Sequence, residues 1–275
     1  MTVAAQPAPS PIRFNARRAA ANWRGVLNPV KHHEAFLELI FAMGGGGFQR
    51  SYESFRADPD GQRLLAERPD VVTALTDTDR LAALTPGTLG HAYHDFMAQN
   101  RLDAGLYDDT YHDLPAIGAR LGWDDDFLYV IRRGIALHDI LHVLGGYGPD
   151  VGGEFGVLGF THGQVGGRMT GGSAAMLMTL PLGVPRRDRL RWWRESVARG
   201  KGACVLFAAP YEEMLAQPLD DVRAALGITP DVDAHPHGHL YSAYQFGGSD
   251  DRAMDTAYEP YAYRPGGSDH ERDAP

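Results

Sequence analysis

With 275 residues, 44% of them hydrophobic, the chain is long enough to form one large domain or two small ones with a sizeable core. Its formal net charge of −9 disfavours a general nucleic-acid-binding protein, so we expect no nucleic-acid partner. Its single cysteine excludes an intrachain disulfide framework and fits a reducing compartment. The longest apolar runs fall far short of the roughly 20 residues that span a bilayer, and no apolar signal-peptide core is visible. We therefore expect a cytoplasmic protein without a transmembrane segment.

The start of the chain predicts a flexible basic leader over residues 1–23. Residues 1–12 are rich in Pro and Ala, a composition typical of disorder. No acidic residue precedes Glu34, whereas five cations do: Arg13, Arg17, Arg18, Arg24 and Lys31. This arm either contacts an anionic membrane surface, where each cation contributes roughly 1 kcal/mol, or is a solvated extension.

Helical periodicity dominates the middle of the chain and predicts a single all-α domain over residues 24–230. Apolar residues recur at intervals of three and four, between residues typical of helix starts and helix ends. The predicted helices run from Pro29 to the glycines at 44–47 and over 58–71, 85–100, 124–146, 152–167, 188–199 and 211–226, the last broken or kinked at Pro218. Segments with strand-like alternation are scarce.

The helix predicted at 152–167 is unusual because glycines recur on one of its faces. Five of them follow one another at helical spacing: Gly152, Gly156, Gly159, Gly163 and Gly167. Glycine lowers helix stability, so this pattern needs a packing reason. It allows either close contact with another helix or a groove for a slim ligand such as an isoprenoid tail.

The end of the chain predicts an irregular acidic tail over residues 231–275. Acidic residues outnumber basic ones there, and Gly, Asp and Tyr are frequent. His235, His237 and His239 alternate with other residues in this tail. They indicate either a second metal site or a flexible polar segment.

Two histidines and two acids within a stretch of small and apolar residues form the candidate functional site. On a helix, His138 and His142 share a face, so they can take adjacent positions around one metal ion. Asp139 lies about 100° round the same helix and is either a third ligand or an acceptor that orients a ligand ring. Glu154, near the start of the next helix, can supply a further oxygen. Histidine and carboxylate ligands without thiolate suit zinc, iron or manganese.

Two other interpretations of this segment remain open. The His-Asp doublet also resembles that of HD-domain phosphohydrolases, which need another histidine upstream and an aspartate downstream. His91, His94 or His112 could be the upstream ligand, but Glu154 is then unexplained. Without a metal, the two histidines would be helix-packing residues with satisfied hydrogen bonds.

The spacing of His138, Asp139 and His142, followed after eleven residues by Glu154, resembles the mark of the coenzyme Q (ubiquinone) biosynthesis protein 4 family. Other segments resemble the same family in the same order. These segments are 58–69, 86–97, 193–213 and 219–228. The resemblance covers roughly residues 24–230.

The resemblance implies an all-helical, peripherally membrane-associated bacterial protein that binds one divalent metal through His138, Asp139, His142 and Glu154. Zinc is the expected metal, with iron and manganese as alternatives. The implied reaction is the oxidative decarboxylation of a prenylated aromatic acid, in which a hydroxyl replaces the carboxylate and the same four residues are catalytic. The implied partners are a prenylated aromatic lipid, a membrane surface, other quinone-biosynthesis enzymes and a second copy of the chain. The alternative function is a non-catalytic lipid-binding scaffold of the quinone-biosynthesis complex.

The chain departs from the family pattern close to the histidines. The family usually carries Arg-Tyr-Arg-Glu before the first histidine, whereas here Arg133 is followed by three residues that cannot ionise. The family also shows a Lys and a second Glu after the metal-binding glutamate, and both are replaced here. The departing residues are Gly134, Ile135, Ala136, Leu158 and Thr161. They favour a divergent member that acts on another aromatic or prenylated acid.

Overall fold

The structure is a computed structural model that describes residues 14–23, 33–44, 46–100, 102, 108–149, 151–179 and 186–234. Within these ranges every regular element is a helix, apart from one isolated β-bridge between Thr88 and Pro218. The predicted all-α fold class is therefore confirmed. The helices are α1 (Ala16–Ala21), α3 (His33–Gly44), α4 (Gly46–Ala57), α5 (Pro59–Glu67), α6 (Val71–Thr76), α7 (Thr78–Ala82), α8 (Leu89–Gln99), α9 (Asp108–Leu121), α10 (Asp125–Ala136), α11 (His138–Gly145), α12 (Val151–Val165), α13 (Arg168–Leu177), α14 (Arg186–Gly202), the 3₁₀ helix η2 (Leu206–Ala208), α15 (Tyr211–Met214), α16 (Leu219–Leu226) and α17 (Asp231–Ala234).

Side-chain caps explain where several helices begin. Asp58 accepts hydrogen bonds from the first free N–H groups of α5, and Asp124 does the same for α10. The Thr88 hydroxyl accepts one from His91 at the start of α8. Such caps satisfy donors that have no partner within the helix, and each contributes about 0.5–2 kcal/mol.

Two predicted helices are each divided in two. The stretch predicted as one helix at 124–146 is α10 followed by α11, and they meet at Leu137. No Gly or Pro stands at this break, and the Leu137 side chain is fully buried in the core. Of the break or kink predicted at Pro218, the structure has the break, between α15 and α16: Pro218 has an extended ψ of 134° and precedes α16 as its cap.

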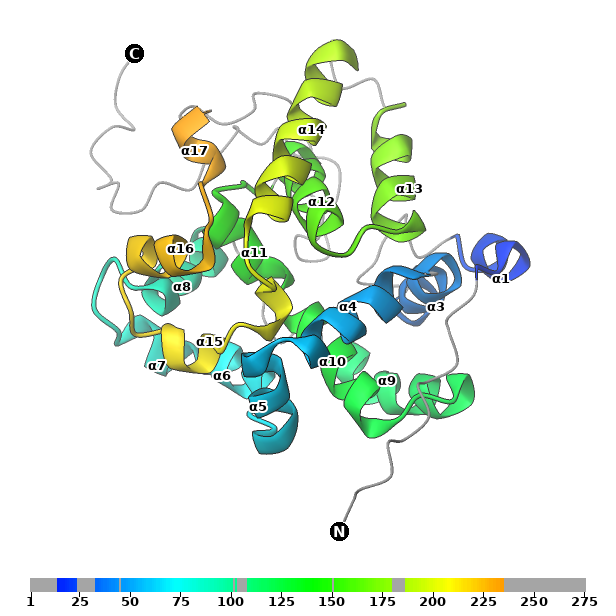
Figure 1. Ribbon diagram of the computed structural model, residues 1–275, viewed down its shortest axis with the longest axis horizontal. Coiled ribbons are helices and arrows are strands. Elements are labelled where there is room, and N and C mark those ends of the chain that lie inside the picture. The colour runs from blue at the N-terminus through cyan, green and yellow to red at the C-terminus, as the bar shows by residue number, and fades with distance from the viewer. Residues whose placement is uncertain are drawn as a thin grey trace.

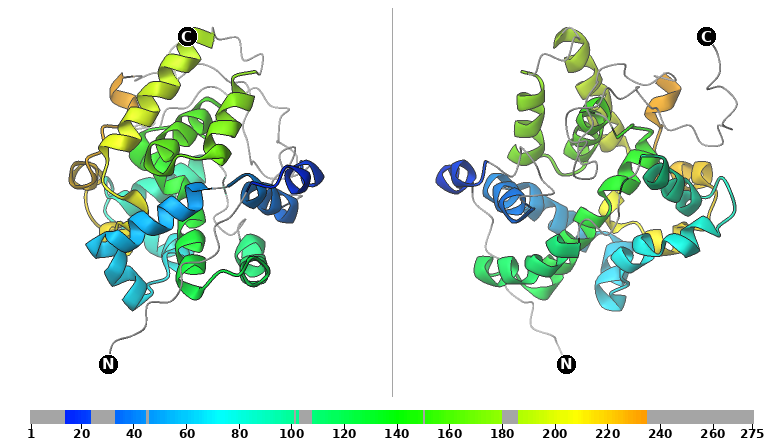
Figure 2. Two further views of the ribbon diagram at one scale, coloured as in Figure 1. Left: turned by 45° about the vertical axis from the view of Figure 1, so that its right-hand side comes forward. Right: turned by 180° about the vertical axis from the view of Figure 1, so that it is seen from behind.

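The helices surround a large shared core. In Figure 1, α12, α13 and α14 stand together at the top, and α3, α4, α9 and α10 lie below them; both views of Figure 2 keep this arrangement. A large apolar core joins most of the helices, and α11 contributes four of its fully buried residues: Ile140, Leu141, Val143 and Leu144. A smaller cluster of Phe155, Ala174 and Trp192 lies between α12, α13 and α14.

The glycine face of α12 is a helix contact. A Cβ on Gly159 would lie 2.8 Å from the Cβ of Ser196 on α14, and one on Gly163 would overlap the Val197 carbonyl of α14. The Gly156 position is taken by the ring of Tyr147. Protein atoms therefore occupy the space that a lipid-tail groove would need at these three glycines.

The helical part of the chain extends slightly beyond the predicted domain boundaries. Within the predicted leader, residues 16–21 form α1, and Arg18 forms an ion pair with Glu38 of α3. Within the predicted tail, Asp231 is buried and forms an ion pair with Arg199 at 2.6 Å. Residues 235–275, with the three tail histidines, and the side chain of His112 lie outside the described residues. Among the helices of the described ranges, none combines the length and hydropathy needed to cross a bilayer.

Candidate metal centre

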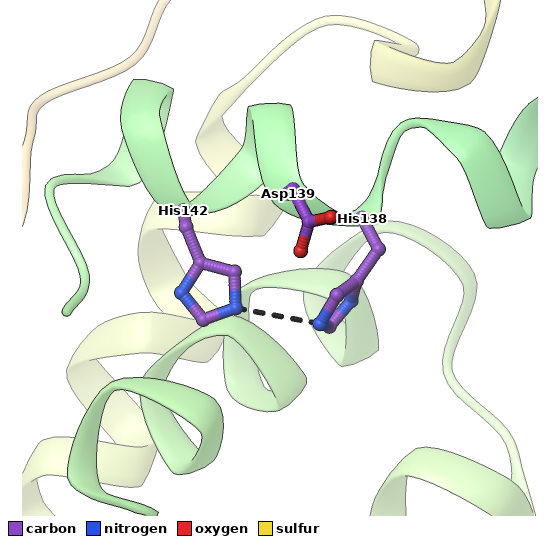
Figure 3. Close-up of side chains that lie close together, drawn as sticks. All are labelled: His138, Asp139 and His142. Carbon is purple, nitrogen blue, oxygen red and sulfur yellow. Dashed lines mark hydrogen bonds between the residues drawn. The ribbon is translucent and has the colours of Figure 1, made fainter. Parts of the chain in front are cut away.

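The two candidate ligand histidines face each other on α11. His138 is the first residue of this eight-residue helix, and His142 lies one turn later on the same side. Their Nε2 atoms are 3.3 Å apart, and the ring planes are nearly perpendicular, at 80° (Figure 3). The predicted shared face is therefore present, and both nitrogens point to one place.

Glu154 reaches the same place from the first turn of α12. Its Oε2 lies 3.4 Å from Nε2 of His138, and its Oε1 lies 3.4 Å from Nε2 of His142. Each carboxylate oxygen thus faces one imidazole. The turn between α11 and α12 brings together residues that are twelve positions apart in the chain.

Asp139 belongs to the same group of polar side chains. One ligand atom from each of His138, Asp139 and His142 lies within 4.8 Å of the others. Figure 3 shows the carboxylate of Asp139 beside the paired rings. The four residues singled out in the sequence are therefore brought together.

The site is buried at one end and partly open at the other. The side chain of His142 is 1% exposed, whereas His138 is 33% and Glu154 is 22% exposed. The ring of Phe96, from α8, stacks on His142 with centroids 5.6 Å apart. Access to the converging donors is therefore from the side of His138 and Glu154.

Neighbouring charges shift the pKa values of the site residues. Burial disfavours the charged form of His138, but the facing Glu154 carboxylate outweighs it and raises the pKa of His138 to about 9. Burial also disfavours ionisation of Glu154, yet the two imidazoles hold its pKa well below the usual range. The pKa of the Asp139 carboxyl is raised, mainly by burial and against the influence of the two imidazoles.

These donors fit a divalent cation. Two imidazole nitrogens and a carboxylate converge from two helices without a thiolate, which is the donor set that zinc, iron or manganese accepts. His142, His138 and Glu154 would hold the cation. Asp139 would be a fourth ligand or would orient the histidine rings.

The upstream histidines form a separate cluster. On α8, Nδ1 of His91 lies 3.1 Å from Asp95, and Nδ1 of His94 lies 3.2 Å from the same carboxylate. Among the described residues, neither histidine joins the group of ligand atoms around His142. The arrangement expected of an HD-domain phosphohydrolase is therefore not formed by these two residues.

Near the candidate ligands, Ala136 is buried in the large core, and Arg133, which precedes the replaced positions, turns away from the site. Arg133 is 1% exposed and forms an ion pair with Glu212 at 2.6 Å, and it donates to the carbonyl oxygens of Phe207 and Ala209. Leu158 packs on the small apolar cluster between α12, α13 and α14. Arg133 therefore anchors α10 to η2 and α15 instead of reaching the candidate ligands.

Two contacts to His142 have no signal in the sequence. One is the stacked ring of Phe96, which belongs to a helix more than forty residues earlier in the chain. The other is the backbone carbonyl of Gly148, whose oxygen lies 3.0 Å from Nδ1 of His142. A backbone acceptor is available at every position, so no residue type marks it.

The fold and the site together define a class of protein. It is all-helical and has a candidate metal centre of two histidines and one glutamate between consecutive helices. Within this class, residues 42–231 match the family described as Coenzyme Q (ubiquinone) biosynthesis protein Coq4. The chain belongs to this family. This finding confirms the resemblance seen in the sequence.

Curated relatives are similar over most of the chain. The human mitochondrial ubiquinone biosynthesis protein COQ4 homologue is 28% identical over 80% of this chain and 80% of its own length. The Bos taurus homologue is 30% identical over 77% of this chain and 86% of its own length. The Danio rerio homologue is 32% identical over 73% of this chain and 71% of its own length. Identities of this size fit a divergent member.

A crystal structure shares the fold. It is that of a Nostoc punctiforme protein described as a ubiquinone biosynthesis protein, with a TM-score of 0.53 and 19% sequence identity. The similarity covers 78% of this chain and 98% of the other. At this level of identity the similarity shows the helical fold alone.

Proposed function

We propose that this protein takes part in ubiquinone biosynthesis as a metal-dependent enzyme that replaces the carboxylate of a prenylated aromatic acid by a hydroxyl. The observation that carries this proposal is the convergence of His138, His142 and Glu154 at 3.3–3.4 Å in a chain of the Coq4 family. Zinc is the expected metal, and iron or manganese would also suit the donors.

Each site residue has a proposed task. His142 and His138 present nitrogen donors from one helix face, and Glu154 adds a carboxylate from the next helix. A bound divalent cation would supply electrostatic stabilisation of negative charge on the substrate carboxylate and on a neighbouring phenol oxygen. Asp139 would complete the donor set or hold a histidine ring in orientation. The nearly complete burial of His142 would keep water from that side of the reacting group.

The substrate and partners follow from the same proposal. A prenylated aromatic acid combines a carboxylate, which the cation can clamp, with an apolar chain that is most soluble in a bilayer. Peripheral contact with a membrane surface and with other quinone-biosynthesis enzymes would supply such a substrate. Since polar residues of the family pattern are replaced here by Gly134, Ile135 and Leu158, the aromatic ring is expected to differ in its polar substituents from the family's usual substrate.

Turnover of a short-chain prenylated hydroxybenzoate tests the proposal. The full chain, loaded in turn with zinc, iron or manganese, is supplied with substrate, dioxygen labelled with the heavy isotope and a two-electron reductant, because the second oxygen atom must be reduced to water. Mass spectrometry should show loss of the carboxylate as carbon dioxide and a new hydroxyl that carries the label. Bound prenylated lipid without turnover would contradict the enzyme proposal and favour the scaffold, and phosphate release from nucleotides would favour a phosphohydrolase.

A further inference from the structure

We propose that the backbone carbonyl of Gly148, admitted by the missing side chain of Gly153, is a positioning group that presents Nε2 of His142 to the metal. The inference rests on the proposed function, because it concerns how a ligand is oriented. It assigns a role to two glycines that the spacing of the ligands does not indicate.

The hydrogen bond between His142 and Gly148 fixes which ring nitrogen is free. Nδ1 of His142 lies 3.0 Å from the Gly148 oxygen in a buried position. A carbonyl oxygen only accepts, so Nδ1 must donate, and in a neutral imidazole the other nitrogen then carries the lone pair. That nitrogen, Nε2, is the atom that faces His138 and Glu154. Such a partner also orients a ligand ring and raises its basicity.

Gly153 is the reason that the carbonyl can stand there. A Cβ at position 153 would overlap the carbonyl oxygen of Gly148 and crowd its carbon atom. The obstacle is backbone, so it cannot turn aside as a flexible side chain would. Gly153 directly precedes Glu154 in the chain. Gly153 leaves room for the carbonyl that faces Nδ1 of His142, and Glu154 faces Nε2 of the same ring.

The turn that carries Gly148 is held by its own contacts. Gly146 has a φ of 72°, which favours glycine, and its N–H donates a hydrogen bond to the carbonyl oxygen of His142. The Tyr147 N–H also donates to this oxygen, with 3.0 Å between the nitrogen and the oxygen. The Tyr147 ring occupies the space where side chains on Gly145 and Gly156 would lie, and so it is wedged between α11 and α12.

A buried arginine closes the end of the ligand helix. Nη2 of Arg223, from α16, donates to the Val143 carbonyl at 2.8 Å, and its Nε donates to the Leu144 carbonyl at 3.1 Å. These carbonyls are at the C-terminal end of α11. The last carbonyl groups of a helix have no N–H partner within the helix, and that end carries partial negative charge. The end of α11 and the following turn therefore form one fixed support for the His142 ring.

The test compares two glycine variants of α12 in the full chain. Gly153→Ala displaces the Gly148 carbonyl, so the affinity for Zn²⁺, measured by chelator competition, should fall about 10–100-fold. The visible absorption spectrum of the Co²⁺-loaded variant should also change, because the ring of His142 is reoriented. Gly163→Ala is the matched control, since its Cβ overlaps the Val197 carbonyl of α14 on the far part of the helix. It should lower stability and leave affinity and spectrum as in the wild type.

The outcomes separate this inference from the proposed function. Wild-type affinity in Gly153→Ala, or equal losses in both variants, would overturn the positioning role alone. A wild-type chain that binds no divalent metal would overturn the proposed function and this inference with it.

A measurement on the wild type covers the case in which Gly153→Ala does not fold. Long-range ¹H–¹⁵N spectra of the Zn²⁺-loaded protein should show His142 protonated at Nδ1 and bound through Nε2. A proton on Nε2 would overturn the inference.

Discussion

His142 is the candidate ligand that the fold protects most. Its ring is almost fully buried, stacks on Phe96 and has both nitrogens engaged, one with Gly148 and the other with the converging donors. His138 and Glu154 lie at the partly open side. We therefore expect that, of the candidate ligands, His142 tolerates replacement least.

Replacement of His142 by alanine should abolish metal binding. The variant loses a nitrogen donor that no neighbouring side chain can supply on that face, and it leaves a cavity beside Phe96. Metal content per chain, measured by elemental analysis after reconstitution, should fall to background. His91→Ala is the matched control, because His91 is a partly buried histidine paired with Asp95 in a separate cluster. A His142→Ala protein that keeps stoichiometric metal would contradict the assignment.

Asp139→Asn distinguishes a ligand from an orienting group. A direct ligand that loses its charge should lose metal nearly as completely as His142→Ala. A carboxylate that only orients a ring should typically cost about 10–100-fold in affinity. Titration of the metal-free variant with Zn²⁺ against a competing chelator separates the two results, and an affinity equal to that of the wild type would rule out both roles.

The residues of the site could be predicted from sequence because their information is local. His138 and His142 lie four apart, and helical geometry alone places them together. To predict that Glu154 reaches the histidines, one must assume that the chain turns back between two helices, and the glycines of that segment permit such a turn. The contacts of Phe96 and Gly148 could not be predicted, since one depends on how α8 packs on α11 and the other uses a backbone atom.

At the scale of helices, the contact of α12 with α14 is the closest packing near the site. Gly159 and Gly163 allow the two backbones to approach, and Trp193 and Ser196 fill the space above Gly159. The sequence allowed a lipid groove or a helix contact here, and the geometry favours the contact.

Gly159→Leu should therefore destabilise the protein. The added side chain would overpack the α12–α14 contact, which typically costs about 1–3 kcal/mol. Gly202→Ala is the control, because a Cβ there meets nothing within 4 Å and should change stability little or raise it slightly. Urea unfolding followed by circular dichroism measures both. A Gly159→Leu protein with wild-type stability and reduced binding of prenylated lipid would instead support a groove.

Arg133→Met should lower stability without emptying the metal site. The variant leaves Glu212 without its buried partner, and breaking such a pair costs about 3–5 kcal/mol. Because the guanidinium turns toward η2 and α15, the folded fraction should bind Zn²⁺ as the wild type does. Combined unfolding and chelator-competition measurements check both parts, and a lost site in a stable protein would show that Arg133 acts on the ligands.

Helix boundaries near the site were less predictable than the helices themselves. The apolar pattern of 124–146 is continuous, yet Leu137 separates α10 from α11. No Gly or Pro stands at position 137, so the sequence carries no direct signal for this break. Pro218 gave a visible signal for the other break, because proline disfavours the helical conformation of the residue before it.

At the scale of the whole molecule, the site lies between α11 and α12. α11 is embedded in the large core through Ile140 and Leu144, while α12 adds Phe155 to the small cluster next to α13 and α14. A cation held by residues of both helices would tie α11 to α12. Binding to the native state alone stabilises it, by about 2.7 kcal/mol at a concentration one hundred times the Kd.

Metal loading should accordingly raise the melting temperature of the wild type. The rise should be reversed by a chelator and should be absent in His142→Ala, whose remaining donors cannot hold the cation. Thermal unfolding with and without excess Zn²⁺ measures the effect. The same upward shift in His142→Ala would place the stabilising metal elsewhere in the chain.

Elemental analysis of the purified wild type is the most direct test of whether the chain binds a divalent metal. The chain is reconstituted separately with zinc, iron and manganese and freed of loosely bound ions before measurement. We expect one divalent metal per chain, which is lost when His142 is replaced. No stoichiometric metal under any of these conditions would contradict it, and His138, Asp139, His142 and Glu154 would then form a buried hydrogen-bond network in a protein without a metal centre.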